Sequence, residues 1–111
     1  MARTIRVWWP KQTTGWVNFN WGGVIDGQSV VHVSACEATD VPGQTFGFPQ
    51  EIAGNTRMRG AAVIGVRNVR PHHDNGGGGG VEFYLEVNWD SPLNVVTDIT
   101  VMDPPEAGAI V

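Results

Sequence analysis

The chain has 111 residues, 41% of them hydrophobic, which is enough for one domain with its own core and too little for two. Asp and Glu number 11 against 7 Lys and Arg, and this formal net charge of −4 has the wrong sign for binding nucleic acid through its phosphates. No stretch approaches the roughly 20 apolar residues that cross a bilayer. Composition and charge therefore predict a single soluble domain, residues 1–111, that binds neither nucleic acid nor membrane.

The basic residues do not form an obvious patch. Arg67 and Arg70 are close in sequence, but regular strand alternation places them on opposite faces. We therefore expect a solvated strand surface here and not a patch that binds nucleic acid.

Hydrophobic alternation with a period of two predicts strands from the N-terminus onward. The first four predicted strands are rich in β-branched and aromatic residues and are bounded by Gly, Pro, Asn or Asp. They cover residues 4–9, 16–21, 30–36 and 61–69. A further short strand is predicted at 45–48.

Residues 81–90 show the clearest alternation in the chain. One face is apolar and includes Val81, Phe83, Leu85, Val87 and Trp89. The other face is mostly polar, so this strand has a core side and a solvent side. Residues 95–102 alternate again after a break at Ser91-Pro92, and the two strands together predict a hairpin.

Six or seven short strands without helices between them predict an all-β fold, an antiparallel two-sheet β-sandwich of immunoglobulin-like or jelly-roll-like size. A small closed barrel would produce the same pattern. The lone cysteine, Cys36, cannot supply the disulfide core of antibody domains, and we expect it to be a small core residue. No motif in the sequence identifies a family.

A run of glycines, residues 76–80, follows the segment 71–75 between two predicted strands. Because glycines have no side chains to pack and cost entropy to order, the run predicts a mobile hairpin loop. A phosphate cradle would need a following helix and usually a lysine, and neither is nearby.

Three residues raise the question of a metal site. In an extended segment His72 and Asp74 project to the same side, and His32 would complete a two-His-one-carboxylate centre. The alternative is a hydrogen-bonded strand histidine at 32 and solvated loop histidines at 72 and 73.

The sequence gives little support for a catalytic cysteine or a catalytic pair of carboxylates. Cys36 precedes Glu37 instead of a cation or a helix start that would activate the thiol. Glu82 and Glu86 would lie about 13 Å apart on one strand, too far for a glycosidase pair. We therefore expect a protein that is not an enzyme and needs no cofactor.

Tryptophan is unusually frequent, with five residues in the chain. Alternation places Trp16 on one strand face with Asn18 and Asn20, and Trp21 on the other face with Val17 and Phe19. An aromatic ring beside amides suits sugar rings, which stack on aromatics and need polar partners for their hydroxyls. It suits a protein interface equally well.

The sequence thus predicts a non-enzymatic structural, assembly or recognition module that self-associates or coats a larger particle, such as a viral particle or filament. Trp8, Trp9, Ile110 and Val111 are the expected interface residues. One alternative is a lectin-like domain that binds glycan at Trp16, Asn18 and Asn20, and another is a metal enzyme using His32, His72 and Asp74. Because residues 1–6 lack the apolar run of a signal peptide, we expect a cytoplasmic or virion location.

Overall fold

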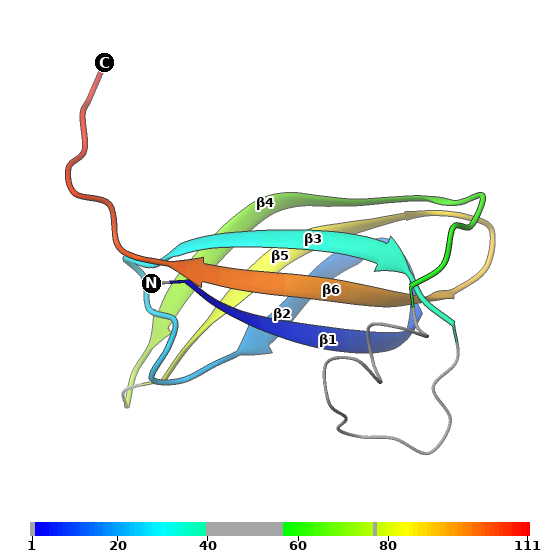
Figure 1. The fold of residues 1–111 in the computed structure, drawn as a ribbon, viewed down its shortest axis with the longest axis horizontal. Coiled ribbons are helices and arrows are strands. Elements are labelled where there is room, and N and C mark those ends of the chain that lie inside the picture. The colour runs from blue at the N-terminus through cyan, green and yellow to red at the C-terminus, as the bar shows by residue number, and fades with distance from the viewer. Residues whose placement is uncertain (1, 40–56, 77) are drawn as a thin grey trace.

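The structure is a computed structural model that describes residues 2–39, 57–76 and 78–111. These residues form six strands (Figure 1), and none of them lies in a helix able to cross a membrane. The strand predicted at 45–48 lies outside the described residues. The strands are β1 (Arg3–Gln12), β2 (Gly15–Asn20), β3 (Val30–Glu37), β4 (Val63–Asp74), β5 (Gly78–Asn88) and β6 (Leu93–Met102).

Within the described part of the chain, the strands pair as two antiparallel sheets of three strands each. The first sheet has the order β1-β6-β3 and the second has the order β2-β5-β4. The two sheets lie face to face as layers (Figure 1), which confirms the predicted antiparallel β-sandwich.

The predicted hairpin of the last two strands is wrong, because β5 and β6 lie in different sheets. Both strands carry an apolar face, and each apolar face must be covered by the other across the core. The connection from Trp89 to Pro92 therefore passes from one sheet to the other. The hairpin in the second sheet joins β4 to β5 instead.

The glycine-rich segment is also more ordered than predicted, because most of it is strand. His72 pairs with Gly80 and Asp74 pairs with Gly78, so the β4–β5 ladder continues nearly to the turn. The cause is close approach by the loop after β2: the backbone nitrogen of Trp21 donates to the Gly79 carbonyl at 2.9 Å, and a Cβ on Gly79 would collide with the Ile25 carbonyl. Glycine leaves room for that loop.

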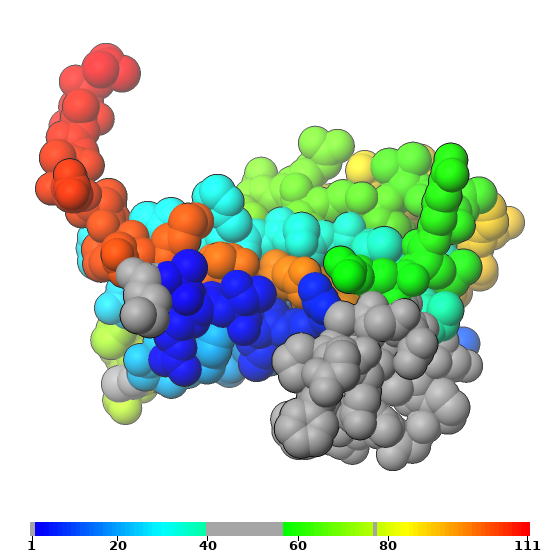
Figure 2. Space-filling model, in the orientation of Figure 1, coloured from blue at the N-terminus to red at the C-terminus, as the bar shows by residue number. Residues whose placement is uncertain are grey.

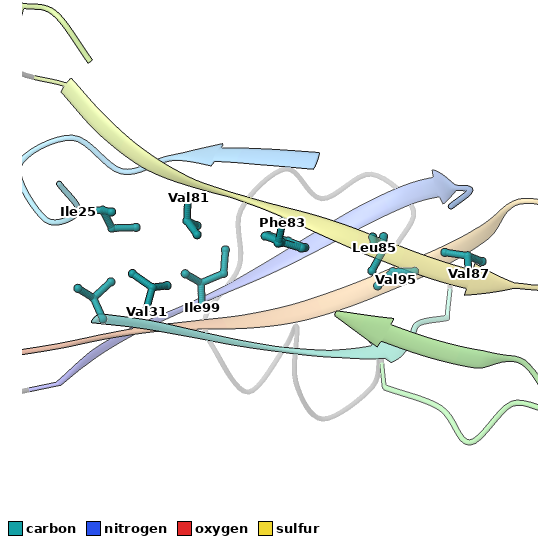
Figure 3. Close-up of a cluster of buried hydrophobic side chains, with 9 residues drawn as sticks. Ile25, Val31, Val81, Phe83, Leu85, Val87, Val95 and Ile99 are labelled. Carbon is teal, nitrogen blue, oxygen red and sulfur yellow. The ribbon is translucent and has the colours of Figure 1, made fainter. Parts of the chain in front are cut away.

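The core lies between the two sheets and is built mainly from β5 and β6 (Figure 3). Alternate side chains of these strands are fully or almost fully buried, and each contributes about 1.5–3 kcal/mol of hydrophobic stabilisation. Val17, Phe19 and Trp21, which the alternation placed on one face, pack against them. The buried set is Ile25, Val31, Val81, Phe83, Leu85, Val87, Val95, Ile99 and Val101.

Two residues expected in the core are not fully enclosed. Trp89 follows Asn88, the last residue of β5, and is 50% exposed. Cys36 is half-buried, and its thiol donates to the Met58 carbonyl at 3.4 Å.

Arg67 and Arg70 point to the same side of the second sheet, contrary to the alternation argument. A β-bulge interrupts the β4–β5 register between them, and Asn68 within it has a φ of 52°. Asn tolerates this left-handed conformation better than most residues. The extra residue shifts the alternation by one position, so both arginines face outward.

Candidate functional site

The candidate site is the solvent side of the second sheet, which we call the outer face. It consists of the side chains of β2, β4 and β5 that alternate with the core-facing ones. The register places them in rows across the three strands. The outer face comprises Trp16, Asn18, Asn20, Arg67, Arg70, His72, Asp74, Glu82, Tyr84 and Glu86.

Trp16 is the main aromatic group of the outer face. It is 56% exposed and lies directly opposite Tyr84 in the β2–β5 register. The two rings meet edge to face, with centroids 5.7 Å apart and an interplanar angle of 75°. This contact fixes the indole through its neighbour while leaving more than half of it open to a ligand.

A chain of hydrogen bonds runs beside Trp16. Asn18 Nδ2 donates to Asn20 Oδ1 at 2.8 Å, and Asn18 Oδ1 lies 2.6 Å from His72 Nε2. His72 Nδ1 lies 2.9 Å from Asp74 Oδ1. Four side chains from β2 and β4 are thus joined across the intervening strand.

Gly80 lies between the two strands that this chain of hydrogen bonds joins. It lies in β5 between Asn20 of β2 and His72 of β4, directly opposite each of them. A Cβ at this position would lie 2.8 Å from Asn20 Oδ1, the acceptor of the Asn18 hydrogen bond. Gly80 also lies close to β2, where an added Cβ would be 2.5 Å from the Phe19 carbonyl oxygen.

The charged side chains of the outer face occur as ion pairs. Arg70 Nη1 lies 2.7 Å from Glu82 Oε1, and Arg67 Nη2 lies 3.5 Å from Glu86 Oε1. Exposed pairs of this kind add little stability, but they balance the charge of the surface. Both carboxylates of β5 therefore have a cationic partner.

The proposed metal ligands are only partly brought together. His72 and Asp74 are hydrogen-bonded to each other, whereas His32 lies on β3 of the first sheet, exposed and opposite Thr100. Among residues 2–39, 57–76 and 78–111, no group of three or more His, Cys, Asp or Glu side chains is placed to hold a metal ion.

The expected interface tryptophans have different environments. Trp9 packs against the core, with its ring 6.2 Å from that of Phe83 in a T-shaped contact and its Nε1 donating to Thr97 Oγ1 at 2.9 Å. Trp8 points to the other side of the first sheet and is half-buried, and its Nε1 donates to the Thr39 carbonyl at 3.0 Å. Trp9 is thus a partly buried residue on the core side of the first sheet.

Ile110 and Val111, the other expected interface residues, are fully exposed, with relative exposures of 104% and 120%. They belong to the segment after β6, which leaves the sandwich and extends away from it (Figure 2). Their hydrophobic side chains are available for contact with another molecule.

Sequence reasoning grouped Trp16, Asn18 and Asn20 correctly on one side of β2, and their exposure agrees with it. The sequence did not predict that His72, Tyr84, Glu82 and Arg70 lie on the same face as these three residues.

The alternation of β5 did separate Glu82, Tyr84 and Glu86 from the core side. Only the strand order, with β5 between β2 and β4, makes these residues neighbours of Trp16.

Comparisons with protein-family models, with curated proteins and with solved structures found no match for the chain.

Proposed function

We propose that this chain is a non-enzymatic glycan-recognition module that binds sugar on its outer face. The observation that carries the proposal is the exposed Trp16 ring beside the two ordered amides of Asn18 and Asn20. The apolar side of a pyranose stacks on an indole, and amides supply the donors and acceptors that sugar hydroxyls require.

The order of the polar side chains favours binding over a merely solvated surface. Asn18 is held from both sides, by Asn20 and by His72. Side chains that are already fixed lose less conformational entropy when a ligand binds. A ligand that binds weakly, such as a sugar, therefore gains the most affinity from a surface whose side chains are already fixed.

The ion pairs favour an uncharged glycan. Arg70 with Glu82 and Arg67 with Glu86 give the outer face compensated charge, so a sulfated or phosphorylated sugar would find each guanidinium already paired. The carboxylates and guanidinium groups remain able to bond hydroxyls.

Titration of the protein with a panel of neutral oligosaccharides, followed by tryptophan fluorescence and calorimetry, tests the proposal. We expect saturable binding by wild type and loss of binding by Trp16→Ala. Trp89→Ala is the matched control, because Trp89 is similarly exposed but lies beyond the end of β5. A flat response across the panel, or equal losses in both variants, would contradict the proposal.

A second candidate function is self-assembly or the coating of a larger particle, such as a virion or filament. The observation in its favour is the exposure of Ile110 and Val111 on a segment that stands clear of the sandwich. Light scattering after size-exclusion chromatography, over a concentration series, tests it. Assembly predicts a mass far above 12.0 kDa that falls when both residues are changed to Ser, whereas a monomer at every concentration would contradict it.

A further inference from the structure

Asn75 begins the turn of the β4–β5 hairpin and is followed by Gly76. Because β4 ends at Asp74, both residues lie outside the strand, and both are exposed. Gly76 has a φ of 93°, a conformation that glycine adopts without strain. Among the described residues, the side-chain amide of Asn75 has no hydrogen-bond partner. This amide is therefore free to turn toward the backbone nitrogen of Gly76.

Such an arrangement exposes an asparagine to deamidation, in which the backbone nitrogen of the following residue attacks the side-chain amide. The attack requires that this nitrogen is accessible and that the backbone can bend toward the side chain. Glycine meets both requirements, because it has no side chain beside its nitrogen and few forbidden backbone conformations.

The other asparagines of the chain are less suited to this reaction. Of the seven in the sequence, Asn75 is the one that precedes a glycine. The rest precede Phe, Trp, Thr or Val, whose branched or aromatic side chains shield the nitrogen. Asn18 and Asn20 are also hydrogen-bonded to each other. Asn88 is the best comparison, because it is exposed at the end of β5 but precedes Trp89.

We propose that the Asn75-Gly76 step is a modification site at which the protein deamidates spontaneously, with water as the co-reactant. The Gly76 nitrogen bonds to Asn75 Cγ, the Cγ–Nδ2 bond breaks, and Nδ2 leaves as ammonia with the hydrogen that the Gly76 nitrogen gives up. Water then opens the five-membered imide at one of its two carbonyls. Opening at Cγ leaves aspartate, whereas opening at the backbone carbonyl leaves isoaspartate, in which the main chain is one atom longer.

The modification acts on the end of the β4–β5 ladder. Further from the turn the ladder is held from outside the hairpin, because the Trp21 nitrogen donates to the Gly79 carbonyl at 2.9 Å. Asp74 and Gly78 form the pair nearest the turn, so a longer main chain and a new negative charge affect this pair first. The Asp74 carboxylate lies 2.9 Å from the His72 ring on the outer face, and that contact is the one we expect to change. The modification site itself does not depend on the glycan-recognition function.

Incubation of the full chain at pH 8 and 37 °C, followed by peptide mapping with mass spectrometry, tests the modification. We expect the peptide that contains Asn75 to gain about one dalton and to separate into aspartyl and isoaspartyl forms. The peptide that contains Asn88 is the internal control and should keep its mass over the same time. An unchanged Asn75 peptide, or conversion of Asn88 before Asn75, would overturn the proposal.

Two variants test the chemistry. Gly76→Ala places a methyl group beside the attacking nitrogen and should slow the conversion at least about tenfold, equivalent to a barrier about 1.4 kcal/mol higher. Because alanine is strained at a φ of 93°, Asn75→Gln provides a second variant that leaves the turn backbone unchanged. Its longer side chain would have to close a six-membered ring, so this peptide should keep its mass. Conversion of Gly76→Ala at the wild-type rate, or a mass gain in Asn75→Gln, would contradict the assignment.

NMR of the purified isoaspartyl form tests the effect on the outer face. The amide resonances of Asp74 and His72 should shift relative to those of the fresh protein, whereas that of Phe83, in the middle of β5, should stay in place. Unshifted resonances at Asp74 and His72 would overturn the effect on the outer face and leave the modification site standing.

Discussion

Gly80 of β5 lies directly opposite Asn20 of β2, and a Cβ at position 80 would lie 2.8 Å from Asn20 Oδ1, the atom that accepts the hydrogen bond of Asn18. Gly80→Ala would place a Cβ 2.5 Å from the Phe19 carbonyl oxygen and 2.9 Å from the Asn20 Cα. Because these are backbone atoms of β2, they cannot rotate away. We expect a loss of about 1–3 kcal/mol in the free energy of unfolding, measured with urea, together with weaker glycan binding.

Gly15→Ala is the control for this prediction. Gly15 lies on the same β2–β5 pair, but nothing stands within 4 Å of an added Cβ. Its unfolding midpoint should stay close to that of wild type. Equal effects of the two substitutions would show that close approach at Gly80 is not the cause.

Trp9 is expected to matter for stability and not for association. Trp9→Ala removes a ring that packs on Phe83 and leaves the buried hydroxyl of Thr97 without its indole donor. We predict a loss of about 3 kcal/mol in the free energy of unfolding and an unchanged mass in solution. Trp16→Ala, which removes an exposed ring, should cost about 1 kcal/mol or less. A change in mass caused by Trp9→Ala in a protein that remains folded would contradict this assignment.

The bulge in β4 leads to a third prediction. Asn68→Val puts a β-branched residue at a φ of 52°, where its Cβ crowds the backbone, and should cost about 1–2 kcal/mol of unfolding free energy. Asn68→Gly should stay within about 0.5 kcal/mol of wild type. Chemical denaturation of both variants is the measurement. If Val were tolerated as well as Gly, the left-handed conformation would not be required.

The sequence predicted the strands well because alternation is a local property. Val81, Phe83 and Leu85 recur at every second position, and burial of that face follows directly. Pairing is not local. Nothing in the short connection from β5 to β6 distinguishes a hairpin from a crossover between sheets, and the choice depends on which apolar faces must cover each other.

The candidate site was predicted only within one strand. Trp16, Asn18 and Asn20 share a face of β2 by alternation alone, whereas the contribution of His72 depends on three later features. The β4 ladder had to continue through Pro71, the glycines had to form a strand, and the bulge at Asn68 had to reset the alternation. Each feature arises from contacts between segments that are distant in sequence. The local alternation of hydrophobic residues therefore cannot predict them.

The last prediction concerns the first sheet, where Arg6 of β1 forms an ion pair with Asp98 of β6. Arg6 Nε and Nη2 lie 2.5 and 2.6 Å from the two carboxylate oxygens. These hydrogen bonds lower the pKa of Asp98 below its ordinary value of 3.8, against the opposing effect of burial and with smaller help from the charges of Arg6 and Arg57. A carboxyl with a lowered pKa in the folded state stabilises the protein above the unfolded-state pKa, and that stabilisation disappears as the pH falls through the folded-state pKa.

Asp98→Asn should therefore lower the free energy of unfolding by about 1–2 kcal/mol at pH 7, since both side chains of the pair are mostly shielded from solvent. The difference from wild type should shrink as the pH falls below about 4, because wild-type Asp98 then takes up a proton and resembles Asn. Urea unfolding from pH 2.5 to 7 measures it. Glu82→Gln breaks the exposed pair with Arg70 and should cost less than about 0.5 kcal/mol at any of these pH values. A cost of Asp98→Asn that stayed constant down to pH 2.5 would mean that the carboxyl contributes through its shape and not through its charge.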